Sequence, residues 1–456
     1  MQSPAHVFRE YDIRGVADRD LTDELAFSLG LGLASTLAAG RSPRLAVGRD
    51  CRLSSGRLHE ALLRGLVEGG AHVVDVGVGP TPMLYFAVHH LETDGGIMIT
   101  GSHNPADENG FKIMRGRASF FGADIQQLRA RLDAGDLPRT PGGKVESIDV
   151  QDDYVATTTS RIARPKEPMK VVLDAGNGVG GPLGLRCLRT IGLEPDPLFC
   201  DMDGLFPNHH PDPTVPKNMA ALIERVVSTG ARVGLAYDGD ADRLGAVDAN
   251  GDIVWGDKLM ILFSRALLET NPGAKILGEV KCSSTLYDDI ARHGGQPIMW
   301  KTGHSLIKTK MKQEGALLAG EMSGHLFFAD RYFGYDDAIY ASMRLVELLA
   351  ASGKTMGELL ADVPRTFTTP ELRVDCPDAT KFDIVAGVAK TFRGRGRHVI
   401  DVDGARIEFP SGWGLVRASN TGPVLVMRFE AQSEAELAKI RGEVEAAVQS
   451  ERQQRP

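Results

Sequence analysis

The chain has 456 residues, 42% hydrophobic and 25% charged, so it predicts roughly three globular domains with a large interior and excludes a mainly disordered chain. Its net charge of −8 provides no global field for nucleic acid, and no apolar run approaches a membrane span, so we expect neither partner. The opening residues are charged where a signal peptide would be apolar, and the 5 cysteines form no CxxC pair, so we expect a reducing cytoplasm.

The first part of the chain repeats one pattern three times. An apolar strand leads through a polar turn and an amphipathic helix into a second apolar strand. Such runs indicate βα units, whose strands pair mainly in parallel with helices on both faces of the sheet. In chain order, the strand, helix and strand are expected at 45–47, 53–67 and 73–76, then at 171–173, 182–191 and 195–199, then at 276–280, 284–292 and 297–300.

Beyond residue 364 the pattern changes to short strands, expected at 371–374, 399–402, 406–409, 415–416 and 424–429. Asp403-Gly404 is suited to a tight hairpin turn, and a final helix carries apolar residues on one stripe. The predicted fold class is therefore α/β, with three related α/β domains of mainly parallel mixed sheets and a smaller C-terminal α+β domain. We expect the domains at 1–145, 146–250, 251–364 and 365–456, with the first linker near 135–143 and 164–168.

The first candidate site is Thr100-Gly101-Ser102-His103-Asn104-Pro105, directly after the apolar strand 96–99. A serine at the carboxyl end of a strand lies where open α/β sheets bind their ligands. The flanking residues do not form the G-x-S-x-G of common hydrolases. The alternative is that these residues form only a turn or a helix cap.

A second candidate follows the strand 233–236, where Asp238, Asp240 and Asp242 alternate with small residues. Three carboxylates at this spacing can converge on one hard cation, and oxygen-only ligation suits Mg²⁺. A solvated acidic turn is the alternative. An EF-hand is excluded because Arg243 and Ala249 stand where it needs glycine and glutamate. An aspartyl-phosphate phosphatase would carry Gly-Thr after its first two aspartates, and that pair is absent.

Residues 176–181 satisfy G-x-G-x-x-G after a strand, with Asp196 at the spacing of a ribose partner. Pro182 and Gly184 would interrupt the helix that must present its amides to a pyrophosphate. We therefore favour a tight structural turn over a dinucleotide site.

Two further loops are polar where strands meet solvent. Residues 320–325 place Glu321, Ser323 and His325 among glycines, a set suited to vicinal sugar hydroxyls. Residues 417–422 combine a guanidinium, hydroxyls and an amide, which suit a phosphate group.

Together the motifs TGSHNP, DGDADR, GEMSGH and RASNTG resemble, in order and spacing, the bacterial phosphomannomutase/phosphoglucomutase group of the phosphohexomutase superfamily. The resemblance covers essentially the whole chain, including residues 11–15. It implies four domains around a deep central cleft, hexose phosphate substrates, and a monomer or homodimer. It also implies that Mg²⁺ is the cofactor and that glucose 1,6-bisphosphate is an activator.

The resemblance further implies a role for each site residue. Ser102 would carry the phosphoryl group and share the metal with Asp238, Asp240 and Asp242. The remaining catalytic positions would be Arg14, His103, Lys112, Arg243 and His325. Substrate would be bound by Tyr11, Lys281, His304, Glu321, Ser323, Arg417, Ser419, Asn420 and Thr421.

The implied activity is interconversion of hexose 6-phosphate and hexose 1-phosphate, of mannose, glucose or both, through a hexose 1,6-bisphosphate. The last domain would close over the ligand about a hinge near Pro364. One alternative is a phosphoglucosamine mutase, although that group usually carries glutamine where Met322 stands. A second is a Mg²⁺-dependent sugar phosphatase, which would release free phosphate, and a third is a non-catalytic sugar-phosphate binder.

Overall fold

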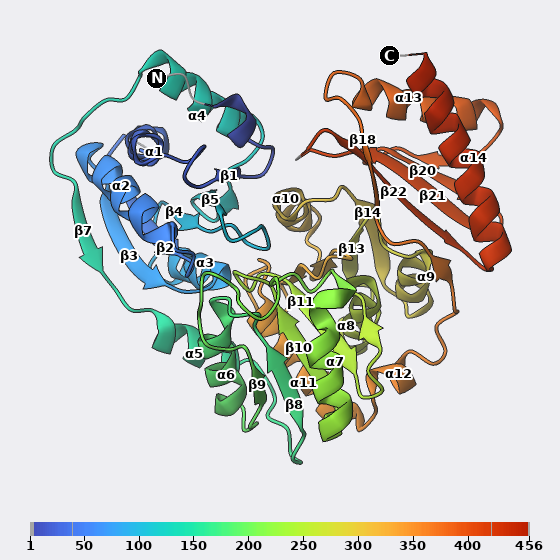
Figure 1. Cartoon of the computed structure of the whole chain (residues 1–456). Helices are drawn as coiled ribbons and strands as arrows, with labels where there is room; N and C mark the ends of the chain where they lie inside the picture. The colour runs from blue at the N-terminus through green and yellow to red at the C-terminus, as the bar shows by residue number, and fades with distance from the viewer. Residues whose placement is uncertain (1–3, 39, 421, 455–456) are drawn as a thin grey trace.

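The computed structural model describes residues 4–38, 40–420 and 422–454. Figure 1 shows four bodies along an open ring, with the first (blue) and the last (red) at its two ends. Each body is built on its own sheet. None of the helices in these residues is long and apolar enough to cross a membrane.

The first body is a mixed sheet in the order β1-β5-β4-β2-β3-β7, with β6 paired to β5. Strands β3 and β4 run parallel to β2, while β5 runs antiparallel to β4 and β1. Its elements are a 3-10 turn (Ala5–Val7), β1 (Ile13–Val16), α1 (Asp23–Leu37), β2 (Arg44–Arg49), α2 (Ser55–Glu68), β3 (His72–Val78), α3 (Thr81–His90), β4 (Gly95–Ile99), β5 (Glu108–Arg115), β6 (Ala118–Ser119), α4 (Ala123–Ala134) and β7 (Lys144–Ser147).

The second body has the strand order β12-β11-β10-β8-β9, in which β8 runs parallel to both β9 and β10. Its apolar central strands are buried on both faces, which explains their continuous hydrophobic runs. Its elements are α5 (Gln151–Thr159), β8 (Val171–Asp174), α6 (Gly180–Thr190), β9 (Asp196–Leu198), a 3-10 turn (Pro216–Met219), α7 (Ala220–Thr229), β10 (Val233–Tyr237), β11 (Leu244–Asp248) and β12 (Ile253–Val254).

The third body has the order β14-β13-β15-β16, with β14 and β15 parallel to β13. Its helix α10 begins beside the first body and contacts β6 (Figure 1). Its elements are α8 (Gly256–Thr270), β13 (Lys275–Glu279), α9 (Ser284–Arg292), β14 (Gln296–Trp300), α10 (His304–Glu314), β15 (Leu318–Gly320), β16 (Leu326–Phe328), α11 (Ala338–Ser352) and α12 (Met356–Leu359).

The fourth body is an antiparallel sheet in the order β17-β22-β21-β20-β19, with β18 also on β22 and with α13 and α14 packed against it. On α14, Ile440, Val444 and Val448 are buried, as the predicted stripe requires. Its elements are β17 (Phe367–Thr368), β18 (Leu372–Asp375), α13 (Lys381–Gly394), β19 (Val399–Ile400), β20 (Ala405–Phe409), β21 (Gly412–Ala418), β22 (Val424–Ala431) and α14 (Glu434–Gln453).

The predicted fold class is confirmed: three mixed α/β bodies precede an α+β body. Two short edge strands extend their sheets beyond the domain ends expected at residues 145 and 250. Strand β7 spans residues 145 and 146 and pairs with β3, and β12 extends the second sheet past residue 250. All four residues of β7 are exposed, so it carries no apolar pattern that would mark it in the sequence.

The hydrophobic cores show how firmly the bodies are joined. One continuous core cluster contains buried residues of the first, second and third bodies, whereas the fourth body has a core of its own. A small cluster that includes Val280, Trp413 and Leu415 connects the third and fourth bodies. The predicted hinge near Pro364 lies between α12 and β17, where the chain leaves the shared core, and it stays a prediction.

Candidate functional site

Ser102 lies in the loop between β4 and β5, with a left-handed φ of 49°. Such a conformation is strained for a residue with a side chain, so its surroundings must hold it. The amide of Ser102 donates to Thr100 Oγ1 at 2.8 Å. The fully buried guanidinium of Arg52 donates to the carbonyl oxygens of Ser102, Asn104 and Glu108 at 2.9, 2.7 and 3.0 Å. Arg52 therefore fixes the loop that presents the serine.

The three predicted metal ligands follow β10 and face Ser102 across the boundary between the first two bodies. Asp238, Asp240 and Asp242 are each 0% exposed. The Ser102 hydroxyl donates to Asp238 Oδ2 at 3.1 Å, and Lys112 Nζ donates to Asp240 Oδ2 at 2.7 Å and to Asp242 Oδ2 at 2.6 Å. The structure thus brings the serine, the lysine and the acidic triplet into one buried cluster, so the ion pairs of Lys112 are not surface ones.

The charges in this cluster do not balance. Burial and the neighbouring carboxylates raise the pKa of Asp238 well above its ordinary value. Burial also opposes ionisation of Asp242, yet the Lys112 ammonium holds its pKa below the ordinary value. The Lys112 ammonium and the Arg243 guanidinium, which lies 3.8 Å from Asp238, do not balance three carboxylates, so the cluster favours additional positive charge.

Oxygen atoms suited to a hard cation are present in the triplet. One ligand atom from each aspartate lies within 4.8 Å of the other two. Asp240 Oδ1 and Asp242 Oδ1 are buried and accept no hydrogen bond from the described residues. Carboxylate oxygens of this kind are the ligands that Mg²⁺ prefers.

Close backbone contacts hold the two loops together. A Cβ on Gly239 would lie 2.3 Å from the Ser102 carbonyl oxygen, so glycine is required for this approach. On the other side of the loop, a Cβ on Gly178 would lie 2.7 Å from the Gly239 carbonyl oxygen, which accepts from the Val179 amide at 3.1 Å. The G-x-G-x-x-G stretch is therefore a structural turn that supports the acidic loop.

One detail of that stretch differs from the expectation. Helix α6 begins at Gly180 and runs through Pro182 and Gly184 without interruption. Proline is tolerated in a first turn because its missing N–H would have no partner within the helix.

The other predicted catalytic residues surround the serine. His103 Nδ1 lies 3.2 Å from Ser102 Oγ, and burial, followed by the positive charge of Arg243, lowers the pKa of His103 well below its ordinary value. Arg14 donates to the Asn104 side chain at 2.9 Å. Arg243 Nε donates to His325 Nε2 at 2.9 Å and lies 3.8 Å from Asp238 Oδ2.

The predicted sugar-binding residues lie on the third body. Glu321 accepts from the Gly303 amide at 2.6 Å and from Ser323 Oγ at 3.2 Å. His304 begins α10, with its ring 6.2 Å from that of Tyr11. These contacts place Glu321, Ser323 and His304 in one neighbourhood, facing the first body.

Lys281 follows β13 and contacts two carboxylates. Its Nζ donates to Glu371 at 3.1 Å and lies 3.5 Å from Glu279. Burial opposes its charge, but Glu279 and Glu371 raise the pKa of Lys281 above its ordinary value, so it stays cationic. Glu279 also accepts from the Met322 amide at 3.1 Å, so it positions the loop that carries Glu321.

Of the predicted phosphate-binding residues of the fourth body, Arg417 lies near the end of β21, and Ser419 and Asn420 lie in the loop that follows it. Arg417 Nε donates to Asp403 Oδ2 at 3.0 Å. Asn420 donates to the Tyr11 hydroxyl at 2.7 Å, and Tyr11 donates to the Thr302 carbonyl oxygen at 2.9 Å. Tyr11 thus joins the first, third and fourth bodies. Ser419 is buried in the same loop, and Thr421 lies outside the described residues.

Sequence reasoning missed four residues that shape this site: Arg52, Glu279, His210 and Asp336. His210 contacts the His103 carbonyl oxygen through Nε2. The Asn-His-His-Pro-Asp-Pro run at residues 208–213 is an unusual polar stretch that could have marked this loop. No local signal marks the other three, because each acts through a distant segment.

A buried serine that meets clustered carboxylates and a lysine across a domain boundary is typical of phosphotransferases that carry a phosphoryl group on a side chain. Family models agree with this class. The models for phosphoglucomutase/phosphomannomutase alpha/beta/alpha domains I, II and III match residues 5–138, 152–251 and 255–367, and the model for the C-terminal domain matches residues 371–447. The chain belongs to the phosphoglucomutase/phosphomannomutase family and is a phosphotransferase of the mutase type.

Individual relatives are similar over nearly their full length. A phosphomannomutase/phosphoglucomutase of Pseudomonas aeruginosa is 46% identical over 438 residues, 96% of this chain and 94% of the relative. A phosphoglucomutase of Neisseria meningitidis is 45% identical over 449 residues, 97% of each chain. The crystal structure of a family protein from Burkholderia thailandensis matches with a TM-score of 0.91 at 43% identity, covering 99% of this chain and 98% of that one.

Proposed function

We propose that the chain interconverts hexose 6-phosphate and hexose 1-phosphate, of mannose, glucose or both, by carrying a phosphoryl group on Ser102. The observation that carries this proposal is the 3.1 Å contact between Ser102 Oγ and Asp238 Oδ2 within the acidic triplet. A sugar-phosphate binder has no need of a strained, buried serine at this place. The mannose and glucose relatives support the choice of hexose.

Asp238, Asp240, Asp242 and Ser102 would hold Mg²⁺, since their oxygen atoms fit a hard cation. When bound, the cation would neutralise charge on the phosphoryl group during transfer. Lys112 is fixed between two of the aspartates and would lie next to the reacting oxygen. Arg243 and Arg14 supply further positive charge beside the serine.

The third and fourth bodies would orient the substrate. Glu321 and Ser323 would bind two sugar hydroxyls, with His304 and Lys281 beside them, and His325 would assist proton transfer. Arg417, Ser419, Asn420 and Thr421 would bind the phosphate that does not react. Because that phosphate can belong to either end of the sugar, a 1,6-bisphosphate can turn over and return its other phosphoryl group to Ser102. The second half reaction then regenerates the starting enzyme.

The decisive test incubates the enzyme with each hexose 1-phosphate, Mg²⁺ and a catalytic amount of glucose 1,6-bisphosphate as activator, and then assays the 6-phosphate isomer. Ser102→Ala should abolish turnover and the phosphorylated form seen by intact-protein mass spectrometry. Ser119→Ala, in the edge strand β6, is the matched control and should do neither. Full turnover by Ser102→Ala would refute the proposal. Free phosphate released at the rate of turnover would indicate a phosphatase, and faster turnover of glucosamine 1-phosphate would indicate a glucosamine phosphate mutase.

A cytoplasmic location is part of the same proposal, since all five cysteines are free and hexose monophosphates are intracellular metabolites. A monomer or a homodimer would both fit it.

A further inference from the structure

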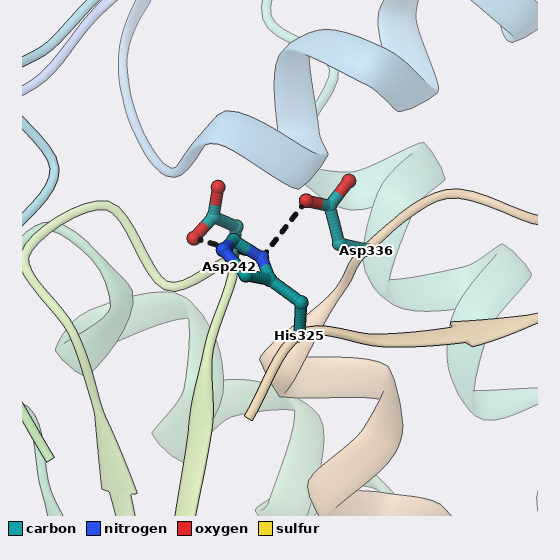
Figure 2. A group of neighbouring side chains, drawn as sticks. All are labelled: Asp242, His325 and Asp336. Carbon is teal, nitrogen blue, oxygen red and sulfur yellow. Dashed lines mark ion pairs between the residues drawn. The ribbon is translucent and has the colours of Figure 1, made fainter. Parts of the chain in front are cut away.

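Three buried ligand atoms meet between the second and third bodies. They are Asp242 Oδ1, His325 Nδ1 and Asp336 Oδ2. Figure 2 shows the imidazole between the two carboxylates, 3.0 Å from Asp336 Oδ2 and 3.6 Å from Asp242 Oδ1. Such a group can share either a divalent cation or a proton, and the two possibilities have different consequences.

A hydrogen bond on the opposite side of the imidazole distinguishes a shared cation from a shared proton. Arg243 Nε donates to His325 Nε2 at 2.9 Å. A guanidinium is always protonated, so Nε2 must supply a lone pair to this bond. The single proton of the neutral ring then resides on Nδ1, and a protonated nitrogen cannot bind a metal ion. The cluster therefore holds a proton between two carboxylates.

Asp336 is the carboxylate placed to hold that proton. It is 0% exposed, and its other oxygen accepts from Lys308 Nζ at 3.0 Å, which keeps the group anionic and fixed. Asp242, by contrast, contacts Lys112 and belongs to the acidic triplet. Asp336 Oδ2 lies 3.0 Å from His325 Nδ1 and 3.7 Å from His304 Nδ1, so His325 is its nearer imidazole, and Asp336 is not part of the acidic triplet.

The faces of the imidazole are also held. The ring stacks on His304, with centroids 5.6 Å apart and an interplanar angle of 20°. Phe327 lies 6.3 Å away at 26°. Its Nε2 lies 3.9 Å from Glu321 Oε2, which is beyond hydrogen-bond distance. Stacking alone does not choose between the two tautomers, whereas a carboxylate beside Nδ1 does.

We propose that Asp336 is a positioning residue that acts through His325 on Arg243. It holds His325 as the Nδ1–H tautomer, so that the Nε2 lone pair orients the Arg243 guanidinium beside Ser102 and Asp238. The series Lys308, Asp336, His325 and Arg243 joins α10 of the third body to the acidic loop of the second. This inference rests on the proposed function in one respect, namely that the group which Arg243 contacts would be the phosphoryl group on Ser102.

The test measures the tautomer directly, by side-chain nitrogen NMR of the full-length protein labelled on histidine nitrogens. The His325 signal is assigned by its loss in His325→Gln. The wild type should show the Nδ1–H form. In Asp336→Asn the side-chain amide can donate to Nδ1, so the Nε2–H form should appear. Its turnover should fall about 10- to 100-fold with little change in KM, and Asp336→Glu should restore part of it.

Asp330→Asn is the matched control, because Asp330 lies on the same loop but pairs with Arg344 at 2.9 Å, away from the imidazole. It should change stability without changing the His325 tautomer. An Nε2–H tautomer in the wild type, an unchanged tautomer in Asp336→Asn, or Zn²⁺ binding to His325 Nδ1 in the wild type would each overturn the inference. The tautomer is read without substrate, so failure of the mutase activity would be a separate result.

Discussion

Asp337, next to Asp336, provides a quantitative test of how the second and third bodies are joined. Its side chain caps α11 by accepting from the Tyr340 amide at 2.8 Å. It also accepts from the Tyr154 hydroxyl of α5 and from the Tyr332 hydroxyl, at 2.8 and 2.7 Å. Burial raises the pKa of Asp337 to about 6, because these hydrogen bonds only partly offset the loss of water.

The raised pKa of Asp337 fixes the sign of the pH dependence of the free energy of unfolding. The folded protein binds the proton more tightly than the unfolded chain does, so the group favours the folded state most at low pH. Its contribution to the free energy of unfolding falls as the pH rises from about 4 to about 6. Moving the pKa from 3.8 to about 6 corresponds to about 3 kcal/mol in total. About half of that is lost between pH 5 and pH 8.

The assay compares the wild type with Asp337→Asn, which keeps an acceptor for the Tyr340 amide and does not titrate. Thermal unfolding is followed at several values between pH 5 and pH 8, and the difference in Tm cancels the other titrating groups. Relative to the variant, the wild type should lose about 1–2 °C across this range, because a unit as large as the three bodies that share a core unfolds with a large entropy. A difference that is constant with pH, or that moves in the opposite direction, would refute the reasoning.

Three further substitutions test single contacts. Arg52→Lys leaves buried loop carbonyls unpaired, so we expect a loss of about 3 kcal/mol in urea unfolding and at least about 10-fold lower turnover. In Gly303→Ala the new Cβ would meet the Tyr11 ring at 2.6 Å, so steady-state kinetics should show a raised KM. Arg406 is buried and donates to the Val280 and Cys282 carbonyl oxygens, both at 2.8 Å, so Arg406→Met should loosen the fourth body, seen as a larger radius of gyration by X-ray scattering.

Matched controls separate these effects from general damage. Arg64→Lys, on an exposed position of α2, should leave turnover unchanged. Gly315 ends α10 with a φ of +66° and has open space around it, so Gly315→Ala should lower stability without raising KM. Arg395→Met, on an exposed position after α13, should leave the scattering profile unchanged. A variant that behaved like its control would show that the contact has no role.

Local patterns were sufficient to predict many elements. The helix expected at 284–292 is α9 with the same bounds, and the strand expected at 171–173 is β8 with one added residue. The positions of Ser102 and of the acidic triplet at strand ends also followed from the sequence. These predictions succeed because hydrophobic periodicity and turn residues act over a few neighbours.

The sequence could not predict which distant groups meet. Ser102 and Asp238 are 136 residues apart, and nothing in either motif gives the 3.1 Å between their oxygen atoms. Arg52 bears no motif, and its role depends on a loop that begins 50 residues later. Asp336 likewise gains its importance only because the ring of His325 turns toward it.

The sequence by itself determined the order of the elements, the residue types at the strand ends and the family to which they belong. The tertiary structure alone decided which lysine contacts the acidic triplet, which guanidinium holds the serine loop, and where the imidazole proton resides. The physical reason is that secondary structure depends on local backbone and side-chain preferences. Charge balance and hydrogen bonding in a buried site depend instead on side chains that folding brings together from separate bodies.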